Sequence, residues 1–180
     1  MKTRQMNRWL KWSLAVGLGA LLALPAAAQE DALKAFPGYV DFGELSGTFG
    51  EPTVQISIGA SLLNLVGSLS AEEDPETAEL FKKLNGVRVN VFETESMAEG
   101  AVDLIKGISS QLSSSGWESV VTVNSADEQV RVFMKMNAET VDGITVMALE
   151  ENEAVFVNVI GNINPAEIQR VMKNFDVEID

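Results

Sequence analysis

Stretches in which apolar and polar residues alternate recur along this chain and predict the strands of a sheet. Residues 54–58 and 87–91 each place valine or isoleucine at every second position, the period of a half-buried strand. Further runs rich in β-branched residues follow at 117–123, 130–136, 141–149 and 154–161. The last run is apolar on both sides apart from Asn158, so we expect a central strand whose two faces are both covered.

Between these runs, apolar residues three and four positions apart predict helices. The apolar stripes are Leu62, Leu65, Val66 and Leu69; Leu80, Phe81 and Leu84; and Ala98, Ala101, Val102, Ile105, Ile108 and Leu112. Asp74-Pro75 is typical of a helix start and Asn85-Gly86 of a helix stop, because aspartate caps free amides and glycine tolerates the left-handed conformation. A capping box at 96–99 precedes the longest stripe, which ends at 113–116.

The clearest helix start lies after the last predicted strand. Asn164, Pro165 and Glu167 stand in register as cap, first helical residue and capping partner. The apolar stripe behind them consists of Ile168, Val171, Met172 and Phe175. The sequence therefore predicts an amphipathic helix near the C-terminus.

The predicted elements follow one another in the order β-α-α-β-α-β-β-β-β-α. Helices are too few and too unevenly placed for a doubly wound parallel sheet. We therefore predict an α+β fold, with a mixed, largely antiparallel sheet and helices mainly on one face. Residues 53–180 are predicted to form this single domain, a length sufficient for one hydrophobic core.

Residues 1–28 differ from the rest and are typical of an export signal. Basic residues precede an uncharged apolar run at 12–24, and proline and alanines follow at 25–28. As a helix the run spans ~20 Å, less than the ~30 Å of a bilayer core, which favours a cleaved signal over an anchor. We expect cleavage between Ala28 and Gln29, a periplasmic location, and no stable membrane anchor in the mature chain.

Residues 29–52 lack a clear period and are rich in glycine, proline and acidic residues. We expect an irregular N-terminal arm that docks on the core through its aromatic residues, because a disordered tail holds fewer of them. Tyr39, Asp41 and Phe42 stand near glycines, which also allows an exposed recognition patch. Trp117 opens a predicted strand, where we expect core anchoring, with ligand stacking as the alternative. These four residues are the candidate binding residues.

Composition excludes several classes of chemistry. The chain has no histidine and no cysteine, which excludes imidazole and thiol catalysis, disulfides, zinc sites built on these ligands, and a lipid-modified cysteine. Its net charge is −13, and removal of residues 1–28 leaves nine basic and 26 acidic residues, a charge of −17. Nucleic acids and anionic lipids repel such a chain, whereas a cationic partner would complement it. We expect no cofactor, metal or nucleic acid.

The order of four segments resembles one bacterial family. The segments are Phe36-Pro-Gly-Tyr-Val-Asp-Phe-Gly-Glu-Leu, Val54-Gln-Ile-Ser-Ile-Gly-Ala-Ser-Leu-Leu, Leu84-Asn-Gly-Val-Arg-Val-Asn-Val-Phe and Ala154-Val-Phe-Val-Asn-Val-Ile-Gly-Asn-Ile. Together they resemble the family catalogued as domain of unknown function 4252, over most of the chain from Phe36 to Phe175. The resemblance implies an exported envelope protein, periplasmic or lipid-anchored, with no established activity and no catalytic residues. Lipid-anchored relatives would need the cysteine that is missing here.

We expect a non-catalytic module that binds a protein or peptide partner in the cell envelope, and two alternatives stay open. A carboxylate-dependent hydrolase of envelope glycans or peptides would need two carboxylates ~5–10 Å apart inside a cleft. A carrier of a small apolar ligand would need a closed apolar cavity between sheet and helices.

Overall fold

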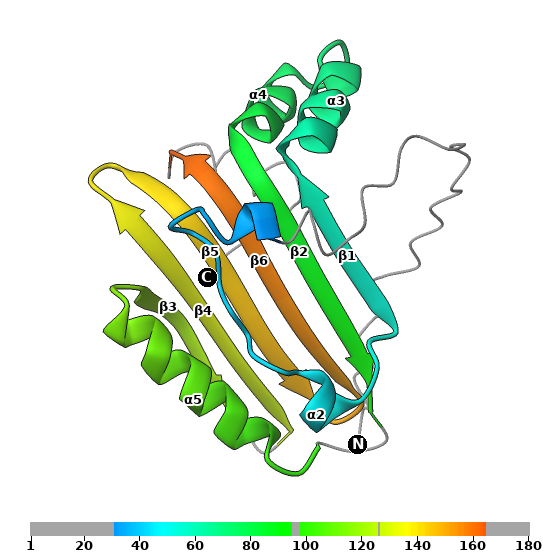
Figure 1. The fold of residues 1–180 in the computed structure, drawn as a ribbon, viewed down its shortest axis with the longest axis vertical. Helices are drawn as coiled ribbons and strands as arrows, with labels where there is room; N and C mark the ends of the chain where they lie inside the picture. Colours follow the sequence, from blue (N-terminus) through cyan, green and yellow to red (C-terminus); the bar gives the residue numbers. More distant parts are fainter. Residues whose placement is uncertain (1–30, 95–97, 126, 165–180) are drawn as a thin grey trace, which may run out of the picture.

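The computed structural model describes residues 31–94, 98–125 and 127–164, and its strands form one six-stranded sheet (Figure 1). The strands are β1 (Val54–Gly59), β2 (Leu84–Glu93), β3 (Glu118–Asn124), β4 (Glu128–Asn137), β5 (Thr140–Glu150) and β6 (Glu153–Ile163). Their order across the sheet is β1-β2-β6-β5-β4-β3, and every neighbouring pair is antiparallel. The predicted α+β class is confirmed.

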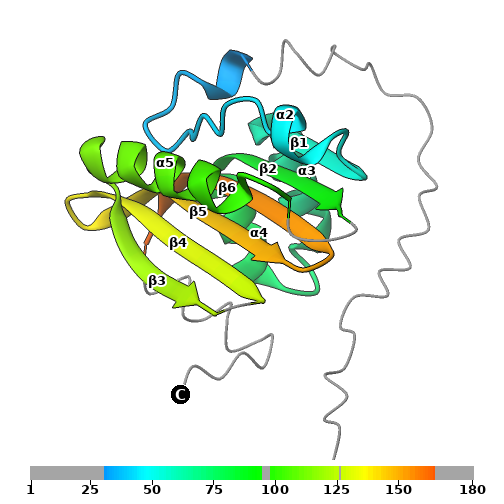
Figure 2. The same cartoon turned by 90° about the horizontal axis from the view of Figure 1, so that it is seen from below.

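The helices occupy two places around this sheet. They are α2 (Ser46–Phe49), α3 (Ala60–Ser70), α4 (Pro75–Lys83) and α5 (Ala101–Ser114). The arm, α2 and α5 cover one face, which we call the arm face (Figure 2). Helices α3 and α4 pack together at one end of the sheet (Figure 1). The predicted export signal and the predicted helix after Asn164 lie outside the described residues.

The main hydrophobic core lies between the arm face and its cover. Phe42 and Phe49 of the arm contact Phe92 of β2 and Phe156 of β6, with ring centroids 5.3 to 5.4 Å apart. The rings of Phe92 and Phe156 lie 6.1 Å from one another. The stripe predicted for α5 is confirmed for its buried members Ala101, Ile105, Ile108 and Leu112. Local helical periodicity therefore placed α5 correctly on the sheet.

The stripe predicted for α3 is wrong. Leu62, Leu65, Val66 and Leu69 are 37–74% exposed, and the buried side of the helix carries Leu63 and Gly67 instead. The reason is a close helix crossing, since a Cβ at Gly67 would lie 2.8 Å from the carbonyl oxygen of Ala78 in α4. Only the glycine side of α3 allows α4 to approach so closely.

The predicted start of α4 is confirmed, but its predicted stop is wrong. Asp74 caps the helix by accepting hydrogen bonds from the backbone N–H (3.0 Å) and hydroxyl (2.5 Å) of Thr77. The hydroxyl bond, and then the backbone bond, hold the pKa of Asp74 below its usual value. The helix ends at Lys83, and Gly86 lies inside β2, where a Cβ would meet Leu33 of the arm at 2.5 Å.

The start of α5 also differs from the prediction. The helix begins at Ala101, directly after Gly100, whose φ of +79° is the left-handed region that favours glycine. The capping box was predicted at 96–99, of which Ser96 and Met97 lie outside the described residues. The helix therefore starts directly after a turn at Gly100, and not at the predicted capping box.

The arm is fixed to the centre of the sheet by Asn158, the polar exception in β6. This side chain is fully buried and accepts a hydrogen bond from the Val40 N–H at 2.9 Å. Its amide donates to the carbonyl oxygens of Gly38 at 2.9 Å and Ile144 at 3.3 Å. One buried side chain therefore satisfies backbone groups of both the arm and β5.

On the second face of the sheet, two neighbouring rows are apolar across all six strands, and glutamates of β2, β4, β5 and β6 border them at one end. Two rows run in register: Val123, Val130, Ala148, Val155, Val91 and Val54, and beside them Val121, Val132, Val146, Val157, Val89 and Ile56. We call these two rows the valine face. A second core cluster, built on Leu63, Leu84, Val141 and Ile163, adjoins it at the end of the sheet that contacts α3 and α4.

Candidate functional site

The four candidate binding residues lie on or beside the arm, in different settings. Phe42 and Trp117 are buried in the main core, Tyr39 is half-buried, and Asp41 is exposed. Asp41 shapes the arm locally, because its carboxylate accepts a hydrogen bond from the N–H of Gly43 at 2.9 Å, and Gly43 has a φ of +69°. Of the four candidates, only Asp41 and part of Tyr39 are therefore accessible to a partner on the surface of the folded protein.

A small hollow brings three of the four candidates together. Its volume is about 150 Å³ and its lining includes Tyr39, Asp41 and Trp117. Lys135 also lines it, with its ammonium group donating to the carbonyl oxygen of Ser115. The space is small, and the tryptophan side chain is 6% exposed as a member of the core, so this hollow offers little surface for recognition.

Arg88 of β2 holds the arm over the sheet. Its guanidinium group donates a hydrogen bond of 2.7 Å to the carbonyl oxygen of Val40. The same group lies 4.6 Å from the ring centroid of Tyr39 and 5.7 Å from that of Phe42. Two of the predicted aromatic residues thus make cation–π contacts with one nearly buried arginine, which positions the arm.

A larger groove of about 340 Å³ lies between the arm and the sheet near the β1 edge; we call it the arm groove. It is lined by Asp41, Phe42, Gly43, Glu44, Leu45, Ser46, Glu51, Pro52, Gln55, Arg88, Asn90 and Phe92. The carboxylates of Asp41, Glu44 and Glu51 belong to exposed residues, whereas Arg88, Asn90 and Phe92 are buried. The groove therefore combines an acidic, exposed side with a buried floor that is partly polar.

Asn90 is the distinctive residue of the arm groove. It is 9% exposed, but its amide is not a fully buried group without a hydrogen bond; among the described residues that holds only for the hydroxyl oxygen of Ser57. Gln55 lies opposite it on β1 and also lines the groove. Because a side-chain amide has both a donor and an acceptor, these two residues can offer hydrogen bonds of both kinds to a ligand in the groove.

Sequence reasoning missed Gln55, Arg88 and Asn90. They are polar positions of the two alternating runs 54–58 and 87–91, where they stand between valine and isoleucine residues. One feature of the sequence could have identified them. Arg88 and Asn90 lie on the same side of their strand as Phe92, and a large aromatic residue indicates that this side is buried. Polar side chains on a buried side of a strand indicate that polar groups of another segment pack against them, and here that segment is the arm.

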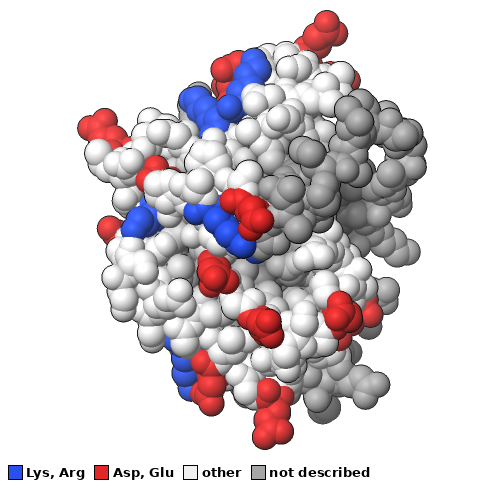
Figure 3. Space-filling view, viewed as in Figure 1, with Lys and Arg blue, Asp and Glu red and all other residues white. Residues whose placement is uncertain are grey.

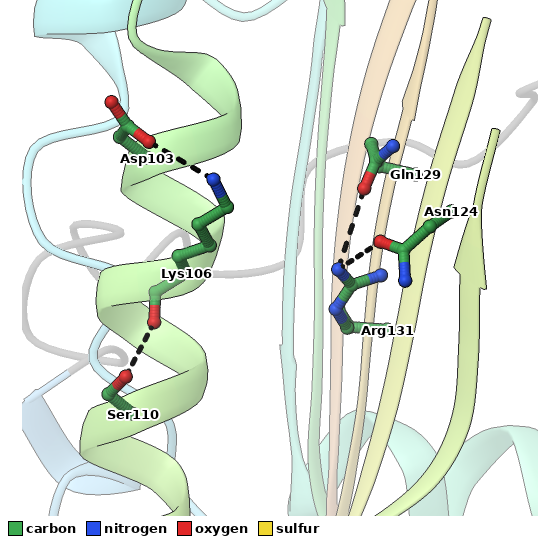
Figure 4. A network of polar contacts seen from close by, with 6 residues as sticks. All are labelled: Asp103, Lys106, Ser110, Asn124, Gln129 and Arg131. Carbon is green, nitrogen blue, oxygen red and sulfur yellow. Dashed lines mark hydrogen bonds and ion pairs between the residues drawn. The ribbon is translucent and has the colours of Figure 1, made fainter. Parts of the chain in front are cut away.

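Other polar contacts on this side of the molecule have local structural explanations (Figure 4). Arg131 donates to Val123 O at 2.8 Å and to Asn124 Oδ1 at 2.5 Å, which braces the β3–β4 hairpin. Asp103 and Lys106 form an exposed pair along α5, 3.4 Å apart. Acidic side chains are scattered over the arm face rather than gathered at one point (Figure 3).

The described residues contain neither a membrane-spanning helix nor a cluster of metal ligands. None of the helices in that part of the chain is long and apolar enough to cross a membrane. Across residues 31–94, 98–125 and 127–164, no group of three or more acidic side chains is placed to hold a metal ion. The arm groove is the candidate site that the geometry of the described residues supports best, because it combines exposed carboxylates with amide side chains.

Comparison with known proteins gives a family and no activity. No curated protein matches the sequence. The match to the family described as domain of unknown function (DUF4252) covers residues 49–171. It contains every strand of the sheet and all helices from α3 to α5, while most of the arm precedes it. Of the four segments that carried the resemblance, the first precedes this match and the other three lie within it. This chain therefore belongs to the DUF4252 family, as the resemblance predicted.

Proposed function

We propose that this protein is an exported envelope protein that acts by binding, without chemistry, and that the arm groove holds an extended basic segment of a partner protein. The observation that supports this most is the lining of the groove, in which the exposed residues Asp41, Glu44 and Glu51 stand together with the amide side chains of Gln55 and Asn90. An amide offers a donor and an acceptor to a peptide backbone, and the carboxylates attract lysine or arginine side chains.

The overall charge supports a basic partner. The chain has a net charge of −13, so a cationic segment is attracted from a distance as well as in the groove. The exposure of Asp41, Glu44 and Glu51 favours binding over the hydrolase alternative, because a catalytic acid needs an enclosed site that keeps it protonated. The polar lining likewise favours a peptide over a small apolar ligand.

Neutralising the carboxylates beside the groove tests this function. The double variant Glu44→Gln/Glu51→Gln is expected to bind a fluorescent Lys-Val-Lys-Val-Lys-Val peptide about tenfold more weakly than the unchanged protein, since two exposed charge contacts each contribute up to about 1 kcal/mol. Fluorescence anisotropy at low and physiological salt measures the dissociation constants. The unchanged protein is expected to bind the matching Glu-Val peptide far more weakly.

The matched control for that variant is Glu150→Gln/Glu151→Gln, which removes the same charge from exposed residues near the β5–β6 turn. The control is expected to retain most of its peptide affinity, because long-range attraction is screened at physiological salt. Equal losses in the two double variants would mean that total charge, rather than the arm groove, binds the peptide. No binding by the unchanged protein would also contradict the proposal.

Export has its own test. In a bacterial host, the protein recovered from the periplasm is expected to start at Gln29, because residues 25–28 supply the small side chains that a signal peptidase requires. Mass spectrometry of the intact chain measures this. A chain that stays in the cytoplasm with residues 1–28 attached would contradict the proposed location.

A further inference from the structure

The residues of the valine face are not part of either hydrophobic core among the described residues. Its members belong neither to the main core nor to the cluster that contacts α3 and α4. All are half-buried or exposed, and Val54, Ile56 and Val121 are 40–42% exposed. The two rows cross the sheet from edge to edge without a charged or polar side chain.

Such a surface requires a cover. An antiparallel sheet with one face in solvent normally alternates apolar and polar residues, so that the solvated face is polar. Here the face that no described residue covers carries the two uniformly apolar rows, and extended exposed apolar surfaces mark interaction sites or lead to aggregation. Valine and isoleucine also form a flat, pleated surface of the kind on which a helix or a second sheet packs.

The course of the chain indicates what the cover is. β6 ends at Ile163, which is 3% exposed in the cluster with Leu63, Leu84 and Val141. Against this cluster pack Ile58, Val87, Val159, Ile144 and Met134, which form a third row in register beside the valine face. The chain therefore leaves the sheet at Asn164 next to the uncovered rows.

The sequence that follows fits this surface. Residues 165–180 remain after Asn164, and their pattern predicts a helix with an apolar stripe of Ile168, Val171, Met172 and Phe175. A helix over residues 165–176 would be ~18 Å long, against ~24 Å for the width of six strands. Arg170 and Lys173 lie on the opposite side of such a helix and would face solvent. The family match also extends into this segment, to residue 171.

We propose that the valine face is the docking site of the chain's own C-terminal segment, residues 165–180, which covers it as an amphipathic helix. A second copy of the chain is a poorer occupant, because each copy has a net charge of −13 and two copies repel one another. The inference is independent of the arm groove, which lies on the other face of the sheet.

A single engineered thiol tests this docking, since the natural chain has no cysteine. Val157→Cys places the thiol in the middle of the valine face. In the exported protein the thiol is expected to react with a maleimide about tenfold more slowly than in the same protein ending at Asn164, because a docked helix allows reaction only when it opens. Far-UV circular dichroism checks that both forms are folded.

A point variant covers the case in which the shortened chain does not fold. Phe175→Asp, added to Val157→Cys, is expected to raise the maleimide rate nearly as much as the deletion, whereas Lys173→Asp on the predicted solvent side is expected to leave it unchanged. Equal rates in all forms would overturn the proposal. The proposal would also be overturned if the thiol of the shortened chain reacted as slowly as that of the full chain and the shortened chain were a dimer in analytical ultracentrifugation. That result would assign the valine face to a second copy.

Discussion

Replacement of Asn158 by alanine is expected to lower the free energy of unfolding by about 3–5 kcal/mol, because it leaves several buried polar groups without partners. The side chain is 0% exposed and bonds the Val40 N–H and the Gly38 carbonyl, both on the arm. It also donates to the carbonyl oxygen of Ile144 in β5. Urea unfolding followed by circular dichroism measures the change as a lower midpoint at a similar slope.

Asn162 provides the matched control for this substitution. It lies on the same strand, is exposed, and its replacement by alanine is expected to change the stability by less than about 0.5 kcal/mol. A similar small change for Asn158→Ala would mean that the arm is not anchored through this residue. The arm groove would then lack the rigid wall that the proposed binding function requires.

Replacement of Gly38 by alanine is the second change with a large expected effect, a loss of about 2–4 kcal/mol from steric overlap with backbone atoms. A Cβ at this position would lie 1.8 Å from the carbonyl oxygen of Asp142 and 2.8 Å from the Cα of Gly143. Backbone atoms of a central region of the sheet cannot move aside as a flexible side chain can. The arm must therefore lift from β5, and the unfolding midpoint falls.

The same substitution at Gly107 is expected to have the opposite sign. Gly107 lies inside α5, it is exposed, and nothing lies within 4 Å of a Cβ placed there. Gly107→Ala should therefore stabilise the protein by about 0.5–1 kcal/mol through helix propensity. If both glycine variants shifted stability in the same direction, the close approach of the arm to β5 would not be what requires glycine at position 38.

The sequence predicted the strands well because their signal is local. Alternation in residues 54–58 and 87–91 marks β1 and β2, and the runs after Trp117 mark the remaining four strands. A strand needs only its own residues to show a period of two. The stripe of α5 and the Asp74 cap of α4 were predictable for the same reason.

The sequence was less informative where contacts between distant segments decide the outcome. Of the four candidate residues only Asp41 and Phe42 line the arm groove, while Tyr39 and Trp117 line the smaller hollow. The arm groove also contains Gln55, Arg88 and Asn90, which no local pattern distinguishes. The apolar stripe of α3 pointed to the wrong side, because Gly67 allows α4 to approach on the other. Both differences arise from packing partners that local periodicity does not describe.

The sequence by itself determined which segments become strands and helices, the α+β class, and the absence of imidazole and thiol chemistry, since each depends on local pattern or composition. Only the tertiary structure decided which side of the sheet is inside. The local pattern of β2 does not show which of its sides is buried, because valines lie on one side and Arg88, Asn90 and Phe92 on the other. The arm decides it, because Asn158 and Arg88 bind its backbone from the polar side of the sheet.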